Sequence, residues 1–322
     1  MATYKEIHGV KVQYRDSDAT AVEGDVWYNA SFGTLKMYVS LGAWASGGAL
    51  NTPRGESFGH GAGTQTAAQV AGGSSPATSA SSENVEHYDG SSWTEVADIN
   101  TARVGAVQDG VQTASFLAAG YSTAYVGITE SWNGTSWTEV ADLSTARAYQ
   151  GGTRGASATA GLVVAGYNGS DVDNVEKWDG SSWTEVAEVN SARRKAGGFG
   201  TSTAAIAVGS APSATNLVES WDGSSWTETT ENNSSRGAQG TAGSQTDGLI
   251  FGAEQAPVGT TTESWDGSSW TEVADLSANR GNAPAGGTGA AAFLAGGAPG
   301  GGVGTATEEF TVAASIETVA FD

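Results

Sequence analysis

Carboxylates are the most numerous side chains in this sequence that could do chemistry. Asp and Glu total 35 of the 322 residues, against 14 Lys and Arg, and the formal net charge is −21. Two carboxylates that flank a glycosidic bond can hydrolyse it. Many carboxylates here, however, belong to a segment that is copied along the chain, "DGSSWTEVAD" and its variants. An active site needs something unique at one place, so the pattern predicts a solvated acidic face and no catalytic residue.

Metal and cofactor chemistry finds little support in the residue types. The chain has no cysteine, and its histidines show no metal-ligand spacing: they are His8, His60 and His87. The run "NGSDVDN" alternates Asp171, Asp173 and Asn174 like a calcium loop, but it lacks the glycine and distal Glu of an EF-hand. Glycine-rich runs such as "GAGTQTAAQVAGG" lack the lysine of a phosphate-binding loop. We therefore predict no metal and no cofactor.

Aromatic residues in variable segments are better candidates for binding a ligand. Tyr121, Tyr125 and Tyr167 lie in segments that differ from one another, between segments that repeat. A tyrosine presents an apolar ring and a polar hydroxyl, which suits stacking against a sugar. Together with Asp171 and Asp173 these tyrosines form our set of ligand-contact candidates.

These candidate residues lie within a sequence repeat, and the structure of the repeat determines where they are placed. The second Trp of each copy occurs at Trp93, Trp137, Trp183, Trp226 and Trp270, at spacings of 44, 46, 43 and 44 residues. An Arg follows each Trp ten residues later: Arg103, Arg147, Arg193, Arg236 and Arg280. Trp44 and Arg54 keep the same spacing and give a sixth pair. Periods of this length are typical of propellers and solenoids.

Within each period the local signals all indicate β-structure. A Gly/Ala-rich apolar stretch after each Arg predicts two strands, a and b, and "NVEKW" and "WTEVA" predict strands c and d around the turn "DGSS". Asp-Gly between β-prone runs is a strong hairpin signal. Four short strands per period fit one propeller blade. The chain lacks the 3.6-residue apolar periodicity that a helical solenoid needs.

The same residues resemble the Kelch repeat over about residues 44 to 312. The resemblance rests on the pattern "R…G…VE.W…W…R", although Gly166, Gly209 and Gly252 stand where Kelch repeats typically have a Gly-Gly pair. It implies an all-β, six-bladed Kelch-like propeller with four antiparallel strands per blade. Counted from Arg to Arg, the blades start near residues 54, 103, 147, 193, 236 and 280.

The last blade lacks a Trp after Phe310, whereas Trp44 has no blade before it. We predict that the Trp44 strand pairs into the sheet that contains Phe293 and Phe310 and closes the ring, because closure removes both loose edges. The alternative is that "SIETVAF" serves as strand d. The predicted domains are an N-terminal β-hairpin attachment module, residues 1–43, and the propeller, residues 44–322.

The repeated residues have a structural interpretation and a functional one. Tryptophans at every blade indicate packing between blades, since large aromatics supply the area that Ala- and Gly-rich strands lack. Each blade also has a Glu two residues before the aromatic of strand c, and an Arg–Glu pair in each blade or across neighbours would explain the equal numbers. The alternative is a charged ring that lines the central channel.

The segments between strands b and c differ completely. From the strand-b glycine to the strand-c Glu they take 14, 10, 10, 10, 11 and 12 residues. A constant frame with variable loops is how a scaffold presents a recognition surface. Neutral drift of unselected loops is the alternative.

Charge and hydropathy limit the partners. An acidic surface repels phosphate backbones, so nucleic acid is not an expected partner. No apolar run reaches the roughly 18 residues of a membrane span, and the start "MATYKEIHGVKVQYRDSD" lacks the apolar region of a signal peptide. We therefore expect no membrane insertion.

The N-terminal segment "EGDVWYNASFGTLKMYV", followed by "GAWASGGALNTPR", is similar to the N-termini of virion proteins from tailed phages of marine cyanobacteria and related bacteria. In those proteins a short module of this kind precedes Kelch-like repeats. The resemblance implies a non-enzymatic tail-fibre or appendage subunit located in the virion, assembled in the host cytoplasm and released by lysis. Its expected partners are other virion proteins through the N-terminal module and a host glycan or envelope protein through the propeller, and a homo-oligomer stays open. The alternatives are a purely structural capsid or tail subunit and a polysaccharide-cleaving enzyme.

Overall fold

The computed structural model describes residues 13–18, 25–55, 60–74, 81–155, 157–254, 257–297 and 304–319. Within these ranges every regular element is a β-strand. The chain divides into two compact units, one formed by Trp44–Phe310 and the other by Met1–Ala43 together with Thr311–Asp322. We had placed residues 311–322 with the propeller. They group with the N-terminal residues because their strand pairs there, as the bond from Val319 N to Leu35 O (2.9 Å) shows.

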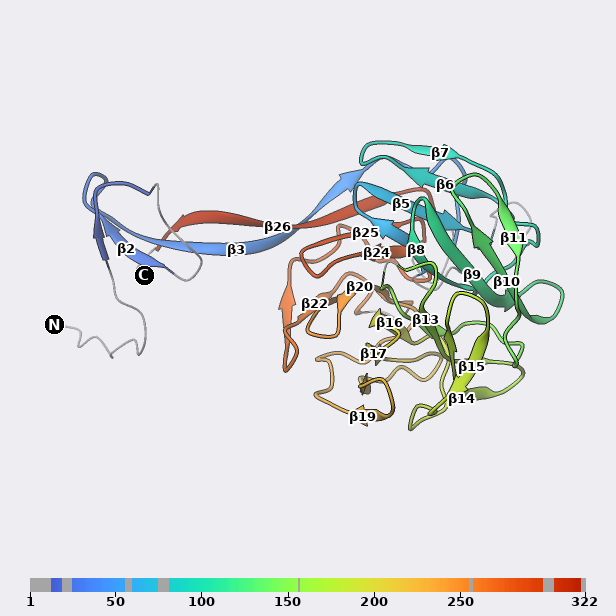
Figure 1. Ribbon diagram of the computed structural model, residues 1–322. Helices are drawn as coiled ribbons and strands as arrows, with labels where there is room; N and C mark the ends of the chain where they lie inside the picture. Colours follow the sequence, from blue (N-terminus) through green and yellow to red (C-terminus); the bar gives the residue numbers. More distant parts are fainter. Residues whose placement is uncertain are drawn as a thin grey trace. The chain divides into compact units, whose positions relative to one another are not determined.

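The larger unit consists of six blades, each a sheet of four antiparallel strands a to d, arranged in a ring (Figure 1). Strands a are β4 (Ala62–Thr64), β8 (Val107–Val111), β12 (Gly151–Gly152), β16 (Gly197–Thr201), β20 (Gly240–Ser244) and β24 (Ala285–Gly287). Strands b are β5 (Ala67–Ala71), β9 (Ala114–Tyr121), β13 (Gly161–Tyr167), β17 (Ala204–Val208), β21 (Asp247–Phe251) and β25 (Ala291–Ala295).

Strands c are β6 (Val85–Tyr88), β10 (Tyr125–Trp132), β14 (Asp171–Trp178), β18 (Val218–Trp221), β22 (Thr262–Trp265) and β26 (Thr307–Thr318). Strands d are β7 (Trp93–Glu95), β11 (Trp137–Glu139), β15 (Trp183–Val186), β19 (Trp226–Glu228), β23 (Trp270–Val273) and β3 (Thr34–Gly47). In the first five blades strand d begins at the repeated Trp. These sheets confirm the all-β, six-bladed propeller.

The repeated "DGSS" segment makes the tight turn between strands c and d. In the fourth blade, Asp222 Oδ1 accepts hydrogen bonds from Ser224 N and Ser225 N, both at 2.8 Å. Gly223 between them has φ +97°, a value that side chains with a Cβ rarely adopt. The same hydrogen bonds lower the pKa of Asp222 to about 2. The Asp side chain therefore stabilises this turn by accepting hydrogen bonds from the backbone of the residues that follow it.

Aromatic side chains form the packing between neighbouring blades. Trp93, in the first blade, lies 6.3 Å from Phe293 of the sixth, and its indole nitrogen donates to Thr307 Oγ1 at 3.0 Å. Trp183 makes equivalent contacts with the blade before it, with Phe116 at 5.7 Å. Each repeated Trp thus fills the space that small strand residues leave open.

The N-terminal strand β3 closes the ring. In the propeller unit the last sheet has the order β24–β25–β26–β3, so Trp44 sits in the sheet of Phe293 and Phe310 as predicted. Trp44 contacts Phe251 of the fifth blade at 4.9 Å and donates from its indole nitrogen to Thr262 Oγ1 at 3.0 Å. Trp93 and Trp183 likewise donate to a threonine hydroxyl of the preceding blade. The alternative that "SIETVAF" supplies strand d is wrong, because its described residues continue strand c in β26.

The smaller unit contains β1 (Gln13–Arg15), β2 (Val26–Asn29) and the outer parts of β3 and β26. The chain turns between β2 and β3 at residues 30–33 and forms a β-hairpin within the predicted N-terminal module. Trp27 is fully buried and donates from its indole nitrogen to Asp18 Oδ1 at 2.9 Å. The segment "IHGVKVQYRD", residues 7–16, alternates like a strand; β1 lies in its second half, and its residues 7–12 lie outside the described residues, as do residues 19–24 of the segment "SDATAVEG".

Candidate binding site on the b–c hairpins

The second and third blades differ from the others in the length of their b–c hairpins. In these two blades strands b and c run on to form hairpins closed by residues 122–124 and 168–170. Tyr121 and Tyr125 are directly opposite each other in the first hairpin, and Tyr167 is opposite Asp171 in the second. The extended pairing fixes the backbone that carries these side chains.

The hairpins bring the three candidate tyrosines together. The ring centroids of Tyr121 and Tyr125 are 5.2 Å apart, and those of Tyr125 and Tyr167 are 5.7 Å apart, both in edge-to-face arrangements. All three side chains are partly exposed. Burial and the two neighbouring tyrosines raise the pKa of Tyr125, so its hydroxyl stays protonated at neutral pH. We call Tyr121, Tyr125 and Tyr167 the tyrosine cluster.

A cation and a carboxylate border the tyrosine cluster. The guanidinium carbon of Arg194 lies 4.0 Å from the ring centroid of Tyr167, a cation–π contact. Arg194 Nε is also 3.4 Å from Asp171 Oδ1, and both side chains are partly exposed. The cluster therefore combines stacking faces with donors and acceptors at its edge, which is the chemistry that binds sugar rings.

The other candidates from the same segment do not form a metal site. The carboxylate of Asp171 is directed to Arg194, and Asn174 donates to Glu185 Oε1 at 2.8 Å. Among the described residues no group of three potential metal-ligand side chains occurs. Three of the variable loops, "SSPATSASSEN", "AEQAPVGTTT" and "GAPGGGVGTAT", lie partly outside the described residues, as does His8.

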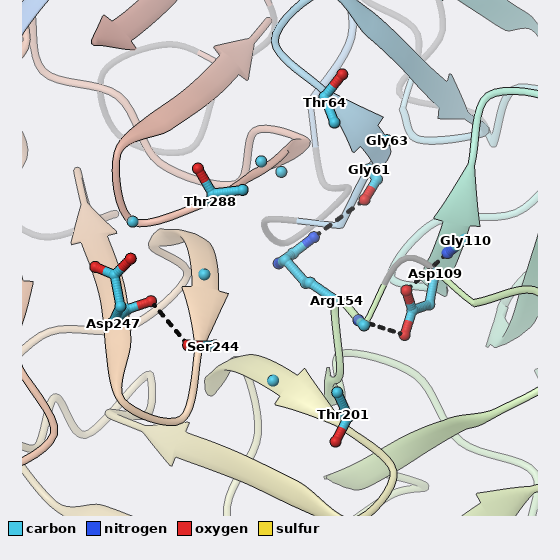
Figure 2. A pocket seen from close by; sticks show the side chains of 16 residues that line it. Gly61, Gly63, Thr64, Asp109, Gly110, Arg154, Thr201, Ser244, Asp247 and Thr288 are labelled. Atoms are coloured by element: carbon cyan, nitrogen blue, oxygen red, sulfur yellow. Dashed lines mark hydrogen bonds between the residues drawn. The ribbon is translucent and has the colours of Figure 1, made fainter. Parts of the chain in front are cut away.

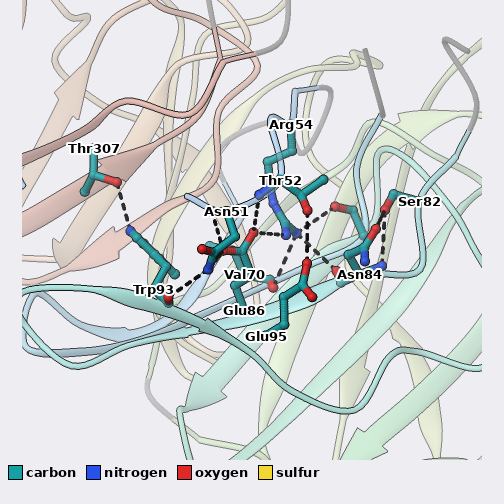
Figure 3. A network of polar contacts seen from close by, with 11 residues as sticks. Asn51, Thr52, Arg54, Val70, Ser82, Asn84, Glu86, Trp93, Glu95 and Thr307 are labelled. Carbon is teal, nitrogen blue, oxygen red and sulfur yellow. Dashed lines mark hydrogen bonds and ion pairs between the residues drawn. The ribbon is translucent and has the colours of Figure 1, made fainter. Parts of the chain in front are cut away.

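The repeated arginines and glutamates form one buried ion pair per blade. The separation is 2.6 to 3.0 Å in Arg54–Glu86, Arg103–Glu130, Arg147–Glu176 and Arg193–Glu219, and the same contact occurs in Arg236–Glu263 and Arg280–Glu308. Figure 3 shows that Arg54 also donates to carbonyl oxygens, while Asn51 N donates to Glu86 Oε2 at 2.8 Å. These residues lie inside the blades, so the alternative of a charged ring lining the channel is wrong.

A second candidate site, which the sequence analysis did not identify, is a cavity at the channel end where the a–b turns meet. The cavity has a volume of about 330 Å³, and at least one glycine from each blade lines it, at equivalent positions beside the a–b turns. We call these the collar glycines: Gly63, Gly110, Gly155, Gly200, Gly243 and Gly287. Asp109, Arg154 and Asp247 supply charge around the cavity (Figure 2). One signal was present, because the spacing of 46 residues between Trp137 and Trp183 is the longest among the five copies from Trp93 to Trp270, and this interval contains Arg154.

The described residues contain no helix that is long and apolar enough to cross a membrane.

Neither a protein-family model nor a curated protein matches the chain. The solved structure of YjhT is similar to it, with a TM-score of 0.66 and 14% sequence identity over 84% of this chain and 99% of that one. At this identity the likeness shows the β-propeller fold alone. The resemblances to Kelch repeats and to phage virion proteins stay predictions.

Proposed function

We propose that the chain is a non-enzymatic, Kelch-like virion subunit whose propeller recognises a host-surface glycan through the tyrosine cluster. The observation that carries the proposal is the meeting of three partly exposed tyrosines from two adjacent blades. In the other blades strand b ends before this point, so the fold itself does not require the arrangement. Surface aromatics at positions that packing does not demand are typical of binding sites.

The chemistry of the cluster favours a sugar over an apolar or nucleic-acid ligand. Each tyrosine offers a ring face or edge and a hydroxyl, and Arg194 and Asp171 supply a donor and an acceptor at the border. A net charge of −21 disfavours phosphate backbones. A sugar ring needs an apolar contact surface, hydrogen-bond donors and hydrogen-bond acceptors. The tyrosine cluster and its two charged neighbours provide all three.

A glycan array probed with the full chain tests the recognition step. We expect Tyr125→Ala to weaken binding roughly tenfold, since Tyr125 contacts both other rings and aromatic contacts are worth about 1 kcal/mol each. Tyr14→Ala is the matched control, because Tyr14 is 75% exposed and lies in the smaller unit. Equal binding by Tyr125→Ala and wild type would exclude the cluster as the site. New reducing ends from host capsule would favour the polysaccharide-cleaving alternative.

The smaller unit is our candidate for attachment to other virion proteins. Tyr14 and Phe32 are 75% and 74% exposed, and Tyr14 stacks on Tyr28 at 5.4 Å. Exposed aromatics on a small sheet are frequent at protein interfaces. We expect the double variant Tyr14→Ser, Phe32→Ser to be lost from purified particles while its propeller melts normally. Undiminished incorporation would exclude this attachment face.

A further inference from the structure

The channel-mouth cavity, lined by the collar glycines, is separate from the tyrosine cluster. It opens at the end of the propeller that carries the a–b turns, whereas the cluster lies on the b–c hairpins. The collar glycines allow these turns to form. In the fifth blade Gly243 has φ +111°, and a Cβ there would lie 2.2 Å from Asp247 O. The repeated frame thus leaves a wall of glycine backbone with few side chains.

Arg154 lines the cavity and has its nitrogens engaged by protein acceptors. Its Nη1 donates to Ala285 O at 2.7 Å and to Gly61 O at 3.3 Å, while its Nε donates to Thr241 Oγ1 at 2.8 Å. Its Nη2 lies 3.5 Å from Nδ1 of the buried His60. Each nitrogen of the guanidinium therefore faces a protein acceptor from another blade. The guanidinium therefore has little capacity left to bind an anion.

A short strand a in the third blade allows Arg154 to reach the cavity. Its strand a, β12, contains only Gly151 and Gly152. The chain then leaves the blade, and Arg154 N donates to Gly200 O of the fourth blade at 3.1 Å. At the equivalent position in the fourth blade, Phe199 is part of the hydrophobic core.

Two carboxylates face the cavity from opposite blades. Asp109 belongs to the second blade and Asp247 to the fifth, and Figure 2 shows them on either side of Arg154. Asp109 is 1% exposed and accepts hydrogen bonds from Thr153 Oγ1 (2.8 Å), Gly110 N (2.7 Å) and Gly155 N (3.2 Å). In the described part of the chain no hydrogen bond or ion pair reaches the carboxylate of Asp247.

Comparison of the blades shows that the charged residues Asp109 and Asp247 are not part of the repeated pattern. Strand b begins at Asp247 in the fifth blade, but it begins with alanine in four others: Ala67, Ala114, Ala204 and Ala291. Asp109 precedes the collar glycine, and other blades have Ala62, Phe199, Ala242 or Gly286 there. A Cβ on Gly289 would lie 2.0 Å from Asp247 Oδ1, so a small residue also makes room for this carboxylate. Other blades form the same strands with uncharged residues at these positions.

We infer that the channel-mouth cavity binds a short aliphatic diamine, with one ammonium group at Asp247 and the other toward Asp109. The charged groups that remain available are acceptors, because Arg154 is engaged. The hydroxyls of Thr201, Ser244 and Thr288 donate to backbone carbonyl oxygens of their own turns. A neutral sugar would need donors as well. Opposite carboxylates cannot share one small metal ion, whereas glycine backbone between them suits an alkyl chain. The net charge of −21 attracts a cation to this mouth.

Calorimetric titration of the full chain with putrescine, a four-carbon diamine, at low ionic strength tests the inference. We expect saturable binding that weakens roughly tenfold in Asp247→Ala, the loss expected for one charge-assisted hydrogen bond. This variant should fold normally, since alanine occupies the position in four blades. Butylamine, which has one ammonium group, should bind more weakly by a similar factor.

Glu188→Gln is the matched control, because Glu188 is exposed and lies outside the cavity. It removes the same unit of charge and should leave putrescine binding unchanged, as should Tyr125→Ala at the tyrosine cluster. Absence of saturable binding by the wild type would overturn the inference. An equal loss in Glu188→Gln would also overturn it, since the effect would then be one of overall charge. Tighter binding of calcium in competition would assign the cavity to a metal instead.

Discussion

At the scale of single residues, each blade holds a charged pair away from water. In the third blade Glu176 Oε1 accepts from Arg147 Nη1 at 2.6 Å, and Glu176 Oε2 accepts from Ser144 N at 2.8 Å. Ser144 and Arg147 belong to the connection that enters the blade, whereas Glu176 lies on strand c. The carboxylate therefore joins the incoming chain to the sheet and balances the charge of a buried guanidinium.

We predict that Glu176→Gln lowers the free energy of unfolding by about 3 to 5 kcal/mol. The amide has nearly the same shape, but it leaves the buried charge of Arg147 without compensation. Urea denaturation gives the measurement. Glu188→Gln removes an exposed carboxylate and should change the free energy by less than about 0.5 kcal/mol. If Glu176→Gln and Glu188→Gln both lost less than about 0.5 kcal/mol of unfolding free energy, the buried pair would not stabilise the blade.

Asp109 makes the free energy of unfolding depend on pH, with lower stability at higher pH. Burial raises its pKa from 3.8 to about 6, despite the hydrogen bonds from Thr153, Gly110 and Gly155. A carboxyl with a raised pKa in the folded state stabilises the fold fully below its unfolded pKa. That contribution is lost as the pH rises from about 4 through 6, because the folded protein then carries a buried charge.

We predict that Asp109→Asn removes this dependence. Relative to the variant, the wild type should lose roughly 3 kcal/mol of unfolding free energy between pH 4 and pH 7. The low pKa of the turn aspartates affects both proteins alike, so it cancels in the comparison. Urea denaturation across this pH range is the measurement. A wild type that gained stability over Asp109→Asn as the pH rose would contradict the assigned shift.

At the scale of elements, the repeat predicts what each blade shares. Spacing alone places strands c and d, the "DGSS" turn and the Trp that begins strand d, because each copy satisfies the same local need. It does not predict that β12 ends at Gly152. That ending depends on whether Arg154 reaches acceptors in three other blades, which is a tertiary property.

The tyrosine cluster shows the same limit. Composition identified tyrosines in variable segments, but their contact depends on the extra length of β9, β10, β13 and β14 and on the bulges in those hairpins. A bulge re-aims the residues that follow it. Register of this kind is set by pairing across the sheet, and one sequence does not display it.

At the scale of the whole molecule, propeller closure depends on a strand from the beginning of the chain. β3 occupies the place of strand d in the last sheet, and residues near both ends of the propeller sequence meet there. Trp44 contacts Phe251 and Phe310, at 4.9 and 5.3 Å. Such closure leaves no open sheet edge within the ring. Simple counting predicted it, because Trp44 had a repeat spacing but no blade.

We predict that Trp44→Ala in the full chain lowers the unfolding free energy of the propeller by roughly 3 kcal/mol, as large-to-small core changes do. Trp270→Ala should cost about as much, because Trp270 holds the equivalent position between the fourth and fifth blades. Tyr14→Ala, in the smaller unit, should leave the transition in place. The fragment of residues 44–310 should melt well above that of residues 49–310, which lacks the Trp44 strand. Equal melting temperatures would show that the ring closes without that strand.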